Sequence, residues 1–183
     1  MESTTQIFLR VQRSADESDF VKGEGFVEGY ADRVQIDSFD FKMNAKEQAP
    51  SKQVGGVNAN IDYSPVTVTK FFDRASMGLA ALLQSRKQLN EVRITVDQQL
   101  EEVGVGKAQN AIIVFHLLQA RIVDFKLDVS EDKVGATIKE TVSFSFRNFS
   151  VEYYYKGTTN NKKSDYRDKA SWFETEYDTQ DLD

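Results

Sequence analysis

Two stretches near the end of the chain decide its fold: ETVSFSF at residues 140–146 and FSVEY at residues 149–153. In each stretch apolar and polar residues alternate, and the phase of the alternation changes around Asn148. Successive side chains of a β-strand point to opposite faces, so a period of two is typical of a strand with one buried face. The two stretches therefore predict two half-buried strands that meet near Asn148.

The same period recurs through most of the chain. Working outward from the two stretches, it predicts further strands over residues 7–12, 34–37, 39–43, 66–71, 91–98, 112–119 and 122–129. The phase flips at Ser38, which indicates a β-bulge or a strand that passes from one sheet to another. About eight strands of this kind are best accommodated in a closed or sandwiched β-barrel. We therefore expect a mainly β protein, a two-sheet antiparallel β-barrel.

One segment, residues 73–86, has a helical period instead. Leu79, Leu82 and Leu83 recur there at helical spacing, and either Asp73 or Ser76 can cap the start of the helix. Leucines at this spacing most often form a stripe that faces the core. The sequence therefore predicts one short α-helix that flanks the barrel.

Composition excludes several classes of function. The chain has 183 residues, the size of one domain, and its formal net charge of −6 makes a nucleic-acid partner a poor expectation. No cysteine and a single histidine exclude disulfides, a thiol nucleophile and a multi-histidine metal centre. The start of the chain lacks a signal-peptide pattern, and no run of about 18 apolar residues occurs. We expect synthesis in the cytosol without a cleaved signal, and no membrane insertion.

The sequence contains no motif that carries catalytic chemistry. It has no Walker loop, no GxGxxG after a strand, no HExxH and no GxSxG. His116 lies in an apolar strand segment, where we expect a side chain that is hydrogen-bonded or faces solvent rather than a catalytic base. We therefore expect a binding or assembly protein, not an enzyme, with no cofactor and no metal ion.

Several stretches occur in the order and at the spacing of a known family: residues 7–11, 36–41, 72–76 with Leu79 and Leu82 after them, and 140–153. The most specific are Asp73-Arg74-Ala75-Ser76 at the helix start and the ETVSFSF…VEY ending. On these motifs, residues 6–155 resemble the haemolysin-coregulated protein (Hcp) family of the type VI secretion system. The chain departs from the family in a long segment at 14–25, in Met77 where proline is common, in phenylalanine where many members have tryptophan, and in its C-terminal tail.

The resemblance implies a phage tail-tube-like fold and a role as a structural subunit. Residues 1–155 would form the Hcp-like barrel domain, which assembles into homo-hexameric rings that stack into a hollow tube. Type VI sheath, spike and baseplate proteins would be its partners, and small effector proteins would bind in the lumen. Such tubes assemble in the cytoplasm and are secreted out of Gram-negative cells. Two alternatives are a phage-like tail-tube subunit and a monomeric barrel of lipocalin type that binds a small ligand.

The resemblance and the strand pattern together nominate two sets of residues for assembly and cargo. The polar segment 44–62 is expected to be an extended loop that contacts the adjacent subunit or the next ring, with Val54, Gly55, Gly56 and Val57 as candidates; a mobile surface loop is the alternative. Phe39, Phe41 and Met43 should share the buried face of their strand, which places three polar residues on the other face. By resemblance that face lines the tube, so Ser38, Asp40 and Lys42 are the lumen-facing candidates.

The helix start and the tail supply the remaining candidates. Asp73, Arg74, Ala75 and Ser76 are nominated because they open the helix. Residues 156–183 form a C-terminal extension of 28 residues whose aromatic content suggests an ordered docking arm, with Trp172, Phe173 and Tyr177 as candidates. A solvated end is the competing interpretation, because order is most often lost at termini. The extension is too short to fold a catalytic module unaided.

Overall fold

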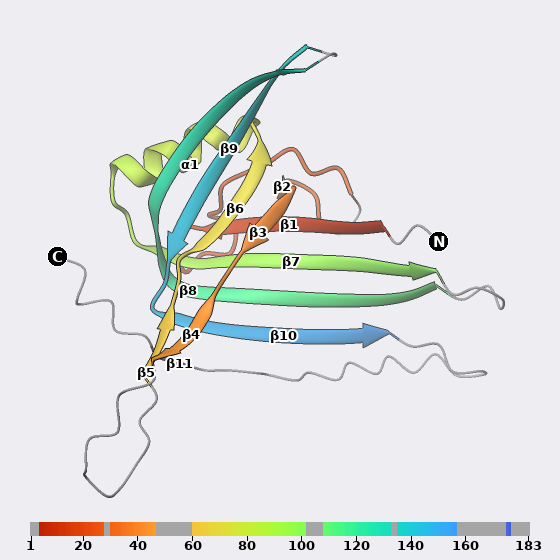
Figure 1. Ribbon diagram of the computed structural model, residues 1–183, viewed down its shortest axis with the longest axis vertical. Coiled ribbons are helices and arrows are strands. Elements are labelled where there is room, and N and C mark those ends of the chain that lie inside the picture. Colours follow the sequence, from red (N-terminus) through yellow and green to blue (C-terminus); the bar gives the residue numbers. More distant parts are fainter. Residues whose placement is uncertain are drawn as a thin grey trace, which may run out of the picture.

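The computed structural model describes residues 4–27, 30–46, 60–101, 108–132, 135–156 and 175–176. These residues form eleven strands and one helix (Figure 1). The elements are β1 (Thr4–Gln12), β2 (Val34–Ile36), β3 (Ser38–Asp40), β4 (Met43–Lys46), β5 (Asn60–Tyr63), β6 (Val66–Phe71), α1 (Arg74–Gln84), β7 (Leu89–Glu101), β8 (Ala108–Asp132), β9 (Gly135–Ser145), β10 (Asn148–Lys156) and β11 (Thr175–Glu176). All strand pairs are antiparallel, as predicted.

One long strand, β8, joins two sheets. Its first half pairs with β7 and β10, and its second half pairs with β9. Gln119 has a left-handed backbone (φ 51°), and the register with β9 shifts between Ile122 and Asp124. Together these irregularities turn the strand out of the first sheet and into the second (Figure 1). The prediction of two separate strands at 112–119 and 122–129 was therefore wrong, because β8 is continuous over 25 residues.

The sheet is not closed into a barrel. The hydrogen-bonded order runs β2-β1-β7-β8-β9-β6-β3, so β2 and β3 stand at its two ends. Only Asp37 separates β2 from β3 along the chain. The two strands therefore cannot lie beside each other and form the hydrogen bonds that would close the sheet. The predicted passage of this segment between sheets is confirmed, since β2 pairs with β1 and β3 with β6. The predicted class, a mainly β protein with antiparallel strands in two sheets and one flanking helix, is confirmed; of the two expected forms, closed or sandwiched, the described residues do not form the closed one.

The core lies between the two sheets and under α1. It contains Leu9, Val11, Val34, Val68, Leu79, Leu82, Leu117, Val142 and Phe144 among its buried residues. The predicted leucine stripe is therefore confirmed for Leu79 and Leu82. Helix α1 begins after Asp73, whose carboxylate accepts a hydrogen bond from the Ala75 N–H. Among the described residues, no helix has the length and apolar character needed to cross a membrane.

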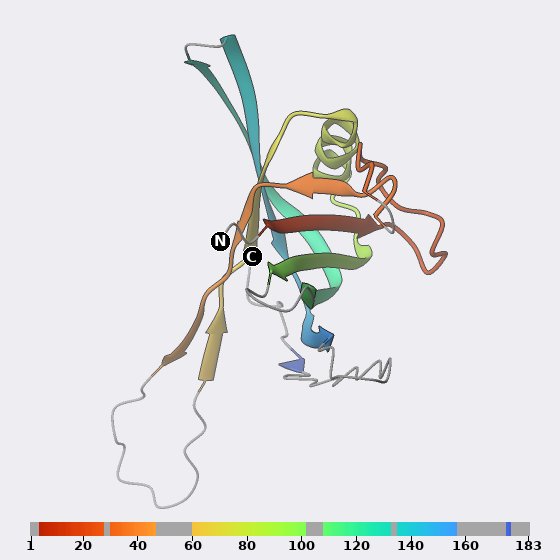
Figure 2. The same ribbon diagram turned by 90° about the vertical axis from the view of Figure 1, so that its right-hand side faces the viewer.

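The β8–β9 hairpin projects beyond this core (Figure 2). Residues 122–129 were predicted to be a half-buried strand, but of its four inward candidates only Phe125 packs against the core, and Val123, Leu127 and Val129 are exposed. The prediction of burial was wrong for Leu127 and Val129, because this part of the hairpin extends past α1 and the opposite sheet (Figure 2), so these two side chains stay exposed in the described part of the chain. Val123 is exposed because it lies at the register shift between Ile122 and Asp124, where the alternation is interrupted. The end of the hairpin therefore presents unburied apolar side chains.

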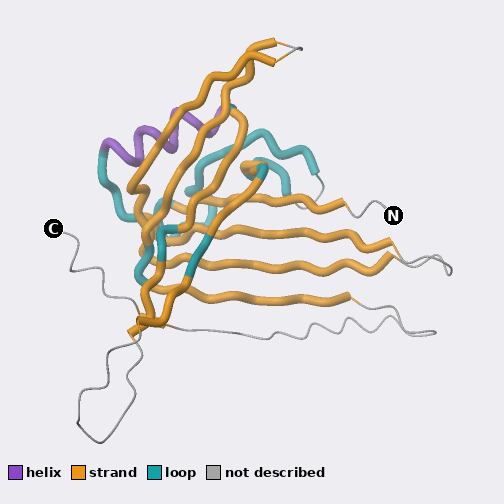
Figure 3. The backbone as a smooth tube through the Cα atoms, in the orientation of Figure 1, coloured by secondary structure: helices purple, strands orange, loops and turns teal. Residues whose placement is uncertain are grey.

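The loop residues 13–27 and 30–33 run beside α1 and β1 (Figure 3). Tyr30 stacks on Phe8 of β1 with ring centroids 4.1 Å apart, and its hydroxyl donates to Asp97 at 3.1 Å. Burial and the Asp97 carboxylate raise the pKa of Tyr30 to about 12, which keeps this donor protonated. Gly23 lets the loop approach closely, because a Cβ at this position would lie 2.5 Å from the Arg33 carbonyl oxygen.

Two predicted appendages are described only in part. The segment 44–62 begins and ends as a hairpin of β4 and β5, not as loop throughout, and Val54, Gly55, Gly56 and Val57 lie outside the described residues. Within the extension 156–183, β11 pairs with β10 through Phe149 and Thr175. Trp172, Phe173 and Tyr177 also lie outside the described residues, so their docking role stays a prediction.

Candidate functional site

The second sheet, formed by β3, β6, β9 and the second half of β8, has a polar face on the side away from α1. Two rows of cross-strand partners cross it: Asp40, Thr67, Ser143 and Asp124 in one row, and Ser38, Thr69, Thr141 and Lys126 in the next. We call these eight residues the polar face. None of them is buried, and the Thr67 and Ser143 hydroxyls are hydrogen-bonded at 2.9 Å.

The local sequence explains why this face is polar. In β6 and β9 the apolar residues Val68 and Val142 point into the core, so the hydroxyl residues between them must point outward. Ser38 and Asp40 are exposed, while Phe39 between them packs on the core. The structure thus brings two of the three lumen-facing candidates together on one face. Their place in a lumen stays a prediction.

Lys42, the third candidate, does not belong to the polar face. Strand β3 ends at Asp40, and the Lys42 backbone forms two hydrogen bonds of 2.9 Å with Ser64. The side chain of Lys42 is exposed. Met43 is 47% exposed, contrary to the expectation that it shares the buried face of Phe41, because the break in the strand interrupts the alternation.

Charged groups surround the polar face. Lys139 pairs with Asp37 at 3.1 Å and lies over the Phe71 ring, with Nζ 4.7 Å from the ring centroid. Lys126 pairs with Asp128 at 2.9 Å. The face therefore presents hydroxyls in its centre and both signs of charge at its margins, which suits water and polar surfaces rather than one tightly held ligand.

The residues at the start of the helix form a structural network. Asp73 caps the helix, and its N–H donates to the Ser76 hydroxyl at 2.9 Å. Lys70 Nζ donates to Asp73 at 2.7 Å, to Glu140 at 2.8 Å and to Ser76 at 3.2 Å. Lys70 and Glu140 are both fully buried. This buried ion pair ties β6, β9 and α1 together.

The other two candidates at the helix start play smaller parts. Ala75 is buried in the core, and Arg74 is exposed and pairs with Asp32 at 3.1 Å. The nominated segment Asp73–Ser76 is thus the cap of α1. Lys70 and Glu140, which complete its network, were not nominated from the sequence.

His116 of β8 is hydrogen-bonded, in line with the sequence-based expectation. Its Nδ1 lies 2.6 Å from a Glu91 carboxylate oxygen, and Arg93 donates to the other oxygen at 2.9 Å. Burial alone would raise the pKa of Glu91, but the hydrogen bond from His116 and the charge of Arg93 hold it below its ordinary value. The ionised carboxylate of Glu91 is therefore favoured by the folded state.

This depressed pKa predicts how stability changes with pH. Stabilisation by Glu91 is present above the pKa of an unfolded glutamate, about 4.3, and is lost as the pH falls through the lower value of the folded state. Glu91→Gln should cost about 1–3 kcal/mol near neutral pH, and less as the pH falls below about 4. Urea unfolding of both proteins over this pH range measures the difference. Glu17→Gln, an exposed control, should change little; a cost of Glu91→Gln that is constant with pH would contradict the assignment.

Known proteins resemble this chain over most of its length. The family model for "Type VI secretion system effector, Hcp" matches residues 8–153. The "Major exported protein" of Pseudomonas aeruginosa is 29% identical over 141 residues, 75% of this chain and 78% of that protein. Hcp1 from Salmonella typhimurium matches with a TM-score of 0.57 and 18% identity, covering 81% of this chain and 86% of that one. Secreted protein Hcp3 from P. aeruginosa matches with a TM-score of 0.54 and 21% identity, covering 90% and 99%.

The fold thus defines an antiparallel two-sheet β protein with one flanking helix, the architecture shared by these solved Hcp structures. The family match extends over far more than half of the sequence. The chain belongs to the Hcp family of the type VI secretion system. The family predicted from the sequence motifs is confirmed.

Proposed function

We propose that this chain is a subunit of the inner tube of the type VI secretion system, and that it forms six-membered rings that stack into a hollow tube. The polar face would line the lumen and contact small effector proteins. The observation that carries the proposal is a polar face on an open sheet, in a chain of the Hcp family. A water-filled channel needs such a face, and a ring needs edges at which subunits meet.

The second sheet offers two such edges. Within the described residues, β3 pairs only with β6, and the second half of β8 pairs only with β9. Their outer backbone N–H and C=O groups are therefore available to a neighbouring chain, because an unpaired edge strand is a template for pairing. Two edges on opposite sides of one sheet would let each subunit contact two neighbours, as a ring requires.

The end of the β8–β9 hairpin supplies an apolar contact surface. Val129 and Ile138 are cross-strand partners and are 69% and 41% exposed. Leu127, which is 49% exposed, precedes Val129 by two residues in β8. Phe72, which is 43% exposed, donates its backbone N–H to the Ile138 carbonyl oxygen at 3.0 Å. We call these four residues the hairpin patch. Exposed apolar clusters mark interaction sites, and we assign this one to a second copy of the chain.

The interior argues against the ligand-binding barrel. Within the described residues, buried side chains such as Leu9, Val68 and Phe144 fill the space between the sheets. An aromatic cluster packs against this core, with Phe41 and Phe149 at 4.7 Å and Phe39 and Phe115 at 5.0 Å between centroids. Phe146 and Tyr63 complete this cluster. A barrel that holds a small molecule needs an interior cavity, whereas buried apolar side chains occupy the centre of the described fold.

The assembly itself is tested by measuring mass and shape. Light scattering should give a hexamer, and negative-stain microscopy should show rings or stacked tubes. Six chains of net charge −6 give a ring of −36, so stacking should strengthen as salt screens the repulsion between rings. A monomer at every protein and salt concentration would overturn the proposal.

The lumen assignment predicts an effect on cargo. Asp40→Arg places a long cation on the polar face without touching the core, so rings should form normally while effector retention falls. The measurement is the amount of effector that co-purifies with the ring. Glu17→Arg makes the same change of charge on an exposed loop and should retain cargo like the unmodified protein. Equal retention by both variants would count against a lumen role for Asp40.

A further inference from the structure

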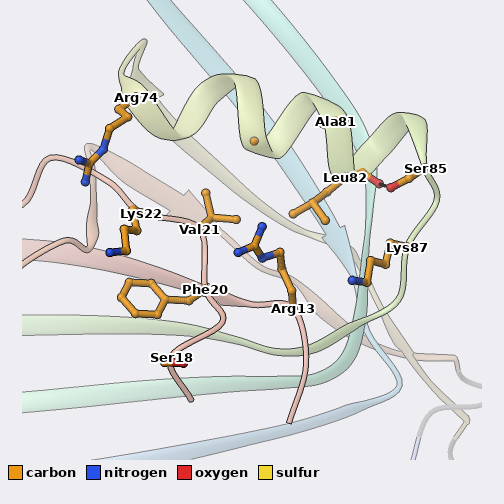
Figure 4. A pocket seen from close by; sticks show the side chains of 11 residues that line it. Arg13, Ser18, Phe20, Val21, Lys22, Arg74, Ala81, Leu82, Ser85 and Lys87 are labelled. Carbon is orange, nitrogen blue, oxygen red and sulfur yellow. Dashed lines mark hydrogen bonds between the residues drawn. The ribbon is translucent and has the colours of Figure 1, made fainter. Parts of the chain in front are cut away.

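A groove of about 560 Å³ lies between α1 and the loop that follows β1 (Figure 4). Val21 from the loop and Leu82 from the helix point toward each other across its apolar floor. Gly78 lets the loop lie this close, because a Cβ there would sit 3.3 Å from a Val21 methyl carbon. The groove therefore offers a shallow apolar strip along the helix.

The charged residues that line the groove are all basic. They are Arg13, Lys22, Arg74 and Lys87. Arg13 pairs with Asp19 at 2.6 Å, and Asp19 itself does not line the groove. Lys22 and Arg74 both pair with Asp32, at 4.0 and 3.1 Å, and the Arg74 backbone N–H donates to the Glu24 carboxylate at 3.2 Å. The groove is thus a locally positive site on a chain whose net charge is −6.

The cations are spread along the helix rather than gathered at one point. Arg74 is the first residue of α1 and Lys87 follows its last turn, so they are separated by roughly 16 Å of helix. Figure 4 shows Arg74 and Lys22 at one end, Lys87 at the other and Arg13 between them. In the described part of the chain, Lys87 has no ion-pair partner. A single phosphate is too small to reach both ends, whereas about five residues of extended peptide span this distance.

We propose that the groove binds an acidic peptide segment of a partner protein, in which an apolar side chain is flanked by carboxylates. The apolar side chain would cover Val21 and Leu82, and the carboxylates would pair with the basic rim. Helix α1 packs on the side of the sheet opposite the polar face, since Lys70 bonds to its first turn while Thr69 lies on the polar face. The partner would therefore bind without occupying the polar face.

Fluorescence anisotropy with a labelled heptapeptide of five glutamates and two leucines tests the proposal. The matched probe replaces every glutamate with glutamine. The groove variant is Lys22→Glu with Lys87→Glu, two side chains that hold no helix or strand in place. Its control is Arg121→Glu with Arg147→Glu, which makes the same change of charge at exposed positions outside the groove. Ala81→Glu, on the exposed helix surface of the groove, is a second variant.

The acidic peptide should bind the full-length protein more weakly as salt rises, and the glutamine peptide should not bind. Both groove variants should lose about tenfold or more in affinity, and the control pair should not. Because the groove lies within one chain, binding is expected for monomer and ring alike, so light scattering of each variant separates this result from a failure to assemble. Equal binding by the groove variant, or groove-dependent binding of anionic vesicles or single-stranded DNA but not of the peptide, would overturn the proposal.

Discussion

Lys70→Ala should lower the free energy of unfolding by about 3–5 kcal/mol, the largest effect on stability that we expect from a single substitution in this chain. Lys70 and Glu140 are fully buried, and Lys70 Nζ lies 2.8 Å from Glu140. Removing the lysine leaves a buried carboxylate whose second oxygen already has no hydrogen-bond partner in the structure. Urea unfolding followed by circular dichroism measures the loss.

Two further variants separate charge from packing. Lys70→Met with Glu140→Leu removes both charges and should recover most of the lost stability, because apolar residues of similar size can replace a buried ion pair. Lys139→Ala removes a half-buried lysine, paired with Asp37 at the surface and one position before Glu140, and should cost less than about 1 kcal/mol. A loss below about 1 kcal/mol for Lys70→Ala would mean that the carboxylate reaches water, contrary to the packing described.

Replacing the hairpin patch should have the largest effect on assembly. Val129→Lys with Ile138→Glu substitutes a pair of cross-strand partners with opposite charges, which preserves attraction within the hairpin. The subunit should fold, but charges in place of an apolar contact should raise the concentration for half-assembly by about a hundredfold or more. Sedimentation velocity over a concentration series measures this shift.

The hairpin offers a matched control on its other face. Ser130 and Thr137 are also cross-strand partners, next to Val129 and Ile138, and Ser130→Lys with Thr137→Glu introduces the same two charges there. This variant should assemble like the unmodified protein. If both variants assemble normally, the hairpin patch is not a subunit contact, and the ring must be held by other surfaces.

Sequence patterns predicted correctly those features that depend on residues within a single strand or helix. The strands, the helix and its Asp73 cap depend on alternation and spacing within a few residues. Closure of the sheet and the continuity of β8 depend on how distant segments pair, which alternation does not encode. The exposure of Leu127 and Val129 illustrates this limit, because their pattern is that of a buried face and only the length of the hairpin leaves it uncovered.

The candidate site shows the same division. Ser38 and Asp40 were placed on an outward face from the phase of their strand alone. Thr67 and Ser143 were part of the same alternation, but their position beside Asp40 follows from the register between strands. A sequence signal did exist for the buried ion pair: Lys70 continues the inward phase of Val66 and Val68. Its partner could not be inferred without knowing which residue lies opposite.

The continuous course of β8 has a mechanical consequence. Its 25 residues are a single covalent path with a contour length of about 80 Å that belongs to both sheets. A pull on the hairpin is carried along this backbone into the ladders with β7 and β10, whose hydrogen bonds stand across the strand and are loaded in shear, many at once rather than one after another. The bend at Gln119 is where the two sheets can flex without sliding. A particle built from such subunits would resist tension along β8 and yield first by bending.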